Sequence, residues 1–226
     1  MPREVAAQPS HPSVPVWDGP TRLFHWGVVL LVFTSWLTER ESWMNAHMIS
    51  GYAMFAALLF RLVWGFIGSE TARFGHFLDT PRAAWAHLRG FARRAPDHEI
   101  GHNAAGGWMV LVMLAALAVQ VGTGLCANDD VSVQGPLADR VGPEWSDWFT
   151  HVHAMTFTVI EVAILLHVGA VLAYALVKRQ DLVRPMITGR KKLPPTIPPP
   201  RMRNPALAAA VLAVAAALVA VVVGWR

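Results

Sequence analysis

The sequence predicts an all-α integral membrane protein, on the basis of its composition, the length of its apolar runs and the absence of strand-like alternation. Of its 226 residues, 54% are hydrophobic and only 15% are charged, and the mean hydropathy is +0.38. Soluble domains of this length carry a larger share of charged residues. The apolar runs approach the length of a bilayer crossing, and they do not alternate apolar with polar residues as barrel strands do. A soluble enzyme is therefore nearly excluded.

Five apolar runs are expected to be transmembrane helices. They cover residues 23–38, 42–68, 106–126, 149–177 and 206–225. The first run is short, and we expect its helix to extend at both polar ends. Arg61 interrupts the second run and Glu161 interrupts the fourth, whereas the fifth is almost purely Ala and Val.

The connections between these runs predict the orientation, because Lys and Arg collect on the cytoplasmic side of a membrane. The N-terminal arm, the 69–99 loop and the 178–203 segment together hold 15 Lys and Arg residues. The opposite side holds three, together with seven Asp and Glu residues. We therefore expect a multi-pass protein with a cytoplasmic N terminus and a C terminus on the outer side. The net charge of +4 reflects this topology, so nucleic-acid binding is not expected.

The chain divides into four parts on this interpretation. Residues 1–21 form a cytoplasmic arm, 22–180 a four-helix bundle, 181–204 a basic Pro-rich cytoplasmic linker, and 205–226 the fifth helix. The arm lacks the apolar core of a signal peptide, so we expect the first helix to be retained.

Two connections have a readable local pattern. Thr80 followed by Pro81 is typical of an N-cap and a first helical residue, and predicts a short helix on the membrane surface. Trp85, Leu88, Phe91 and Ala92 would form its apolar face. The proline-rich stretch 194–200 predicts a stiff spacer before the fifth helix.

Cysteine usage restricts the chemistry that the chain can support. Cys126 is the only cysteine, which excludes an intrachain disulfide, covalent haem attachment through paired cysteines, a cysteine-ligated iron–sulfur cluster and a multi-cysteine zinc site. Any metal site must therefore use the ten histidines.

Four of these histidines fall at two levels of the membrane. His153 and His167 are 14 residues apart, a rotation of about 1400°, so they share a helix face and lie about 21 Å apart along the axis. His47 is level with His153 on the outer side, and His25 is level with His167 on the cytoplasmic side. One imidazole from each of two helices suits a six-coordinate haem iron, whereas zinc or copper would need three or four ligands together. The spacing predicts two non-covalent b-type haems with bis-histidine ligation, His25 with His167 and His47 with His153.

The other histidines fit this pattern less well. A single histidine at the end of a span is usually an interfacial residue, but two level pairs inside a bilayer indicate function. His151 competes with His153 but points about 160° away from His167. His102 has no obvious partner. His11, His76, His87 and His98 lie in the basic connections, where we expect them to be solvated.

Gly51 and Arg61 are further candidates for cofactor binding. Gly51 follows His47 by four residues, so its missing side chain would let a flat macrocycle approach; close helix packing is the alternative. Arg61 follows His47 by 14 residues, on the same face and level with the cytoplasmic haem. Its guanidinium would pair with haem propionates, or else extend to the lipid headgroups.

Several motifs carry a resemblance to a known family. They are Trp17–Trp26 (WDGPTRLFHW), His47–Gly51 (HMISG), Phe60–Gly68 (FRLVWGFIG), Ile100–Asn103 (IGHN) and the pair His153 and His167. Over residues 16 to 180 the chain resembles bacterial di-haem membrane cytochromes b, which include the b-type cytochrome subunit of nickel–iron hydrogenases and cytochrome b-561 proteins. The resemblance implies a location in the bacterial inner membrane and the same histidine pairing. The fifth helix departs from the four-helix pattern of this family; we expect it to anchor the chain, with holding a partner subunit as the alternative.

The expected fold is thus a four-helix haem-binding transmembrane bundle plus a fifth C-terminal transmembrane helix. The resemblance implies electron transfer between the membrane quinone pool and a periplasmic redox partner, such as a c-type cytochrome or a hydrogenase. The alternative is a complete enzyme, a quinone-reducing oxidase of a small periplasmic substrate such as superoxide. A transporter with structural histidines is a third possibility. The acidic loop 129–147 is a candidate docking surface, or an ordinary solvated loop.

Overall fold

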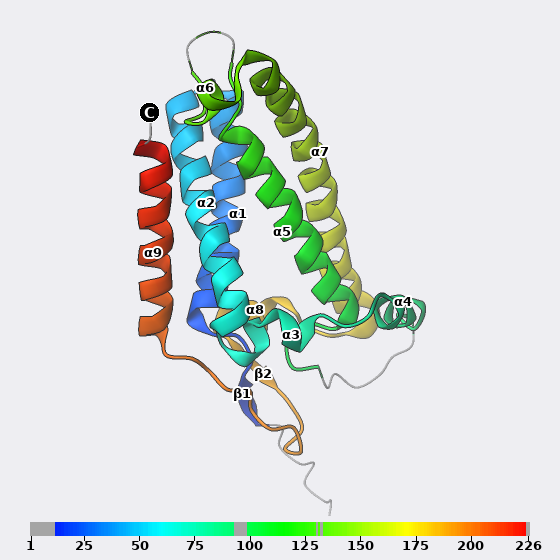
Figure 1. Cartoon of the computed structure of the whole chain (residues 1–226). Coiled ribbons are helices and arrows are strands. Elements are labelled where there is room, and N and C mark those ends of the chain that lie inside the picture. Colours follow the sequence, from blue (N-terminus) through cyan, green and yellow to red (C-terminus); the bar gives the residue numbers. More distant parts are fainter. Residues whose placement is uncertain (1–11, 93–98, 130, 132, 225–226) are drawn as a thin grey trace, which may run out of the picture.

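The computed structural model describes residues 12–92, 99–129, 131 and 133–224. The first half of the expected arm, residues 1–11, and the last two residues of the chain lie outside this range. Within it, five long helices run roughly side by side, and all the short elements except α6 gather at the end opposite the C terminus (Figure 1).

All five predicted spans are helical. Their bounds are α1 Gly19–Arg40, α2 Met44–Ile67, α5 Ala104–Gly124, α7 Pro143–Ala173, which continues as the π-helix η2 Tyr174–Lys178, and α9 Pro205–Gly224. By length and composition, α2, α5, α7 with η2, and α9 can each cross a membrane. The less apolar α1 is 22 residues long and packs against α2. The prediction of an all-α membrane protein is confirmed.

Local sequence explains where the helices begin. Asp18 caps α1, because its carboxylate accepts a hydrogen bond from the Thr21 amide at 2.7 Å. Asn103 caps α5 in the same way through the Gly106 amide, at 2.8 Å. The long α7 begins at Pro143, directly after Gly142, whose φ of +82° favours glycine.

The helices pack around α2. It lies against α1 on one side and α9 on another, while α5 packs against α7. Met54, Leu117 and Ile160 join α2, α5 and α7 in one apolar cluster. On the far side, Ala208 and Ala215 of α9 pack against Phe60 of α2, where small residues allow close approach. The fifth helix is therefore part of the packed structure rather than a detached segment.

The end of the bundle that carries the N-terminal arm, the 69–103 connection and the 178–204 segment is called the basic end here. Its short elements are β1 Ser13–Pro15, η1 Glu70–Ala72, α3 Phe74–Phe77, α4 Pro81–Arg89, α8 Val183–Thr188 and β2 Arg190–Lys192. β1 and β2 pair antiparallel, so the arm is hydrogen-bonded to the linker. No pattern in the sequence predicted this pairing.

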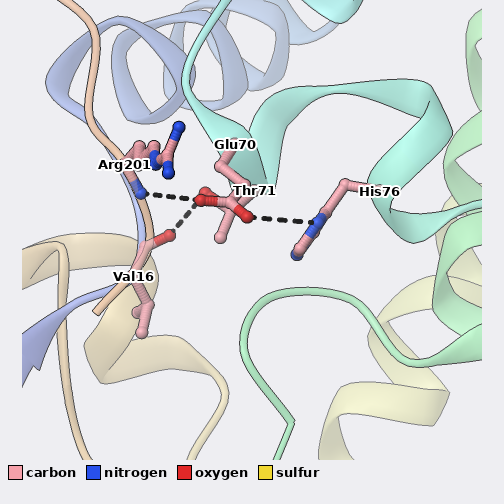
Figure 2. A network of polar contacts seen from close by, with 5 residues as sticks. All are labelled: Val16, Glu70, Thr71, His76 and Arg201. Atoms are coloured by element: carbon pink, nitrogen blue, oxygen red, sulfur yellow. Dashed lines mark hydrogen bonds and ion pairs between the residues drawn. The ribbon is translucent and has the colours of Figure 1, made fainter. Parts of the chain in front are cut away.

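A polar network holds these segments together (Figure 2). The Thr71 hydroxyl donates to the Val16 carbonyl at 2.7 Å, and the Arg201 amide donates to the Glu70 carboxylate at 2.8 Å. This amide holds the pKa of Glu70 below its ordinary value. His76 lies 3.9 Å from the other Glu70 oxygen. The spacer before α9 is thus fixed against η1 and the arm.

The surface helix α4 begins as predicted, since the Thr80 hydroxyl accepts from the Ala83 amide at 3.2 Å. It ends at Arg89, so the prediction that Phe91 continues its apolar face was wrong. The Phe91 ring instead packs edge-on against Tyr174, with ring centres 5.1 Å apart. At the opposite end of the bundle, called the acidic end here, α6 Ala138–Val141 lies in the acidic loop.

Candidate functional site

The fold brings the four predicted histidines together as two pairs. His25 of α1 and His167 of α7 have ring centres 6.3 Å apart, at the basic end. His47 of α2 and His153 of α7 have ring centres 6.2 Å apart, at the acidic end. Helix α7 therefore contributes one imidazole to each pair, and the two levels are about 21 Å apart along its axis.

These distances match the dimensions of a metal ion held between two imidazoles. A metal–imidazole bond is about 2 Å long and the ring centre lies about 1.1 Å beyond the nitrogen, so two such rings on opposite sides of one ion have centres about 6 Å apart. Among the described residues, no group of three or more His, Cys, Asp or Glu side chains could hold a metal ion. Both pairs therefore fit an ion that takes its remaining ligands from a cofactor, as haem iron does.

A backbone carbonyl holds the His47 ring by one nitrogen and leaves the other nitrogen available to a ligand. Its Nδ1 lies 2.9 Å from the carbonyl oxygen of Ser35 on α1. A carbonyl only accepts, so Nδ1 carries the proton and Nε2 keeps the lone pair that binds metal. The Ser50 hydroxyl ties the two helices at this level, 2.7 Å from the Ser35 hydroxyl and 2.8 Å from the His47 carbonyl.

His153 is held in the same way by α5. Its Nδ1 donates to the Gln120 carbonyl at 2.8 Å, and the Gln120 side-chain amide donates to its Nε2 at 3.1 Å. Iron at Nε2 would displace this amide, whose own oxygen is buried without a partner and so does not hold it in place. His47 and His153 therefore fit a haem iron once the Gln120 side chain rotates away from Nε2 of His153.

A glycine makes room for the His153 ring. A Cβ atom on Gly124 would lie 2.8 Å from Cε1 and 3.1 Å from Nδ1 of His153. Any larger residue would push the imidazole away from its carbonyl. Neither Gly124 nor the hydrogen-bonding groups of Ser35 and Gln120 was found from the sequence. A polar side chain inside an apolar span was the available signal for the Gln120 amide, whereas the two backbone carbonyls leave no signal in the sequence.

The basic-end pair has different surroundings. The Nδ1 atom of His25 is shielded from solvent and has no hydrogen-bond partner. Its ring packs edge-on against Trp26, with ring centres 4.9 Å apart. His167 makes no hydrogen bond within the described part of the chain. Aromatic packing and helix position, rather than backbone carbonyls, orient this pair.

Gly51 and His151 can also be placed. A Cβ atom added to Gly51 would meet no other atom within 4 Å, so close helix packing does not explain this glycine. The open space beside His47 is compatible with the approach of a macrocycle. The side chain of His151 is exposed on α7, away from both pairs.

Arg61 is enclosed by protein. It is 3% exposed, and its guanidinium lies over the rings of Phe74 and Phe77, 4.8 and 5.9 Å from their centres. Its Nη1 is buried without a partner. This burial contradicts the alternative in which Arg61 extends to the lipid headgroups. An unpaired buried guanidinium donor instead favours an anionic group at this position.

His102 lies beside Arg61 and the basic-end pair. Its ring sits between Trp17 and Phe77, with ring centres 4.7 and 4.9 Å away. Burial lowers the pKa of His102 to about 3, with smaller contributions from Arg61, His167 and His25. His102 is thus a neutral member of this cluster, and its ring neighbours are Trp17 and Phe77.

A polar cluster links α4 to the end of α7. His87 Nε2 lies 2.5 Å from the Tyr174 hydroxyl, and the Asn103 amide donates to the same oxygen at 2.8 Å. Burial and the nearby Lys178 lower the pKa of His87. His87 was expected to be solvated, but it is partly buried against Tyr174, a contact between distant segments that the sequence does not show.

The structure defines an all-α membrane protein with two pairs of histidines between its long helices. The model of the prokaryotic cytochrome b561 family matches residues 16–189, which include α1, α2, α5, α7 and all four histidines. The chain belongs to this family. No curated protein and no solved structure gives a significant match. The protein is therefore a bacterial membrane protein of electron transport that binds b-type haem, as the family does.

Proposed function

We propose that the protein carries electrons across the bacterial inner membrane through two b-type haems, between a periplasmic redox partner and the membrane quinone pool. The observation that carries this proposal is the presence of two histidine pairs with almost equal separations, 6.3 and 6.2 Å, one at each end of the bundle. A single pair could support one redox site. Two pairs that share α7 supply a relay between the two membrane surfaces.

Each side chain has a defined part in this relay. His25 and His167 would ligate one haem iron, and His47 and His153 the other; each haem supplies reversible one-electron chemistry when bound. The carbonyls of Ser35 and Gln120 hold the acidic-end imidazoles in the tautomer that ligates through Nε2. Gly51 leaves space beside His47, and Arg61 offers an unpaired donor to a propionate.

The distribution of charge supports an orientation with the basic end in the cytoplasm and the C terminus in the periplasm. The acidic end would then face a periplasmic donor such as a c-type cytochrome or a hydrogenase-like protein. In this arrangement the chain acts as an electron-transfer subunit rather than as a complete enzyme.

Haem stoichiometry in purified variants tests the ligand assignment. We expect about two haems per chain in the wild type and about one in each of His25→Ala, His47→Ala, His153→Ala and His167→Ala, because an iron that loses an axial ligand is no longer held. Pyridine haemochrome spectra give the haem content, and reduced-minus-oxidised spectra report the bis-histidine state.

His151→Ala is the matched control, because it removes an imidazole from the same helix two residues from His153. It should keep both haems. Full retention of two bis-histidine haems in His153→Ala would overturn the assignment. Reduction of the haems in isolated membranes by a quinol tests the quinone link separately, and the absence of any such reduction would contradict it.

A further inference from the structure

Two polar side chains lie on the exposed side of α7, near the middle of its span. Helix α7 stands at the edge of the bundle, on the side opposite α9 (Figure 1). Glu161 is exposed, and so is Thr158 one turn before it. Along the axis, Glu161 lies about 12 Å from the level of His153 and about 9 Å from that of His167. Around the helix it points about 80° and 120° away from these two histidines.

Neither side chain has a partner in the part of the chain that the structure describes. Glu161 and Thr158 make no side-chain hydrogen bond or ion pair there. The neighbouring Thr156, by contrast, donates its hydroxyl to the Val152 carbonyl at 2.8 Å. Acyl chains offer no donor or acceptor, and a carboxyl group at this depth is too far from the headgroups to reach them. Another protein surface is therefore needed to satisfy both groups.

Thr158 belongs to a stripe of exposed residues along α7, called the α7 seam here. Its members are spaced alternately by three and four residues, which is the period of a coiled-coil contact. They are Met155, Thr158, Val162, Leu165, Gly169 and Leu172. A Cβ atom added to Gly169 would meet no other atom within 4 Å, so contacts within this chain do not explain the glycine. In a membrane, glycine lets a second helix approach closely.

We propose that a second copy of this chain packs against the α7 seam, with the two α7 helices parallel about a two-fold axis. Such an axis requires a self-complementary surface. The seam meets this requirement, because Thr158 supplies a hydrogen-bond donor and Glu161, beside it, supplies an acceptor. Each carboxyl group accepts from the Thr158 hydroxyl of the other copy, so the contact satisfies all four groups. This dimer goes beyond the proposed electron-transfer function, and the seam points away from both histidine pairs.

Cysteine cross-linking in isolated membranes tests the contact directly. The native thiol is removed by Cys126→Ser, and Leu165→Cys is added at the centre of the seam, where the side chain is 72% exposed. Mild oxidation should give a disulfide-linked product of twice the chain mass. Val112→Cys is the matched control, because Val112 is also exposed and lies within the α5 span, but away from the seam. It should stay monomeric.

Three results of this experiment would overturn the proposal. They are no cross-link at Leu165→Cys, equal cross-linking at both positions, and a product whose mass shows a different protein as the partner.

Glu161→Leu tests the hydrogen bonds. Leucine is compatible with lipid, so the variant should keep its haem absorbance, which reports folding. The dimer dissociation constant, measured by sedimentation equilibrium of the haem-loaded protein in detergent, should rise by about tenfold or more, because two symmetric hydrogen bonds are lost. Glu161→Gln keeps an acceptor and should raise it less.

Thr158→Val removes the donor instead of the acceptor and should also weaken the dimer. It serves as the second variant if Glu161→Leu fails to fold. Dissociation constants equal to that of the wild type in these variants would overturn the assigned contact. Haem stoichiometry is measured on the same samples, so a failure of the dimer proposal is distinguishable from a failure of the proposed function.

Discussion

Asp18 is expected to stabilise the start of α1 and to set the charge beside the basic-end histidines. One carboxylate oxygen caps α1 through the Thr21 amide at 2.7 Å, and the other accepts from Trp64 Nε1 at 3.1 Å. Trp64 is fully buried, at 0% exposed. Asp18→Ala therefore removes a helix cap, worth about 1 kcal/mol, and leaves a buried indole donor unpaired, at a cost of about 1–3 kcal/mol.

We expect Asp18→Ala to lower the free energy of unfolding by about 2–4 kcal/mol, the sum of these two effects. Asp18→Asn retains a carbonyl that can cap α1, so its loss should be smaller. Denaturant titration in detergent, followed by the haem absorbance band and by circular dichroism, measures the change. Asp181→Ala is the control, because this exposed carboxylate also accepts from two backbone amides, of Val183 and Arg184.

Water can replace the exposed Asp181 carboxylate as the acceptor for these two amides. The free energy of unfolding of Asp181→Ala should therefore fall by less than about 1 kcal/mol. Both Asp18 variants also remove the negative charge that opposes Arg61, so both should raise the potential of the basic-end haem. An Asp18→Ala protein as stable as the Asp181→Ala protein would refute the reasoning about the buried network.

Substitutions at two further positions test neighbouring groups. Arg61→Leu should lower the reduction potential of the basic-end haem alone. Arg61→Lys should lower it less, because the lysine keeps the positive charge but not the forked hydrogen-bonding geometry of arginine. Equal potentials in redox titrations of the wild type and Arg61→Leu would contradict this. Since the pKa of His102 is lowered to about 3 in the folded state, stability should fall as pH decreases from about 6.5 toward 3. His102→Leu should flatten this decline in apparent Tm, and an unchanged pH profile would count against it.

Much of the fold was predictable from the sequence because a bilayer imposes strong local rules. Helix α2 was expected over residues 42–68 and occupies Met44–Ile67, and α9 was expected over 206–225 and occupies Pro205–Gly224. The 14-residue interval between His153 and His167 indicated one imidazole at each level. In the structure, the ring centre of each of these histidines lies about 6 Å from the ring centre of its expected partner. Their role as haem ligands remains a prediction.

The surroundings of these histidines could not be predicted, because they depend on contacts between distant segments. The carbonyls that orient His47 and His153 belong to Ser35 and Gln120, and a carbonyl leaves no trace in sequence patterns. Arg61 lies over Phe74 only because α3 folds back beneath α2. The pairing of β1 with β2 joins residues almost 180 positions apart, and three-residue strands carry no periodic signal.

The sequence by itself determined the membrane class, the five helices, the uneven distribution of charge and the two levels of histidine. These follow from hydropathy, helical period and charge, which act along a single segment. Only the tertiary structure decided which imidazoles donate to carbonyls, which arginines are enclosed, and how the arm, η1 and the linker hold one another. Hydrogen bonding and burial depend on which helices lie side by side, and the difference between the two histidine pairs arises at that level.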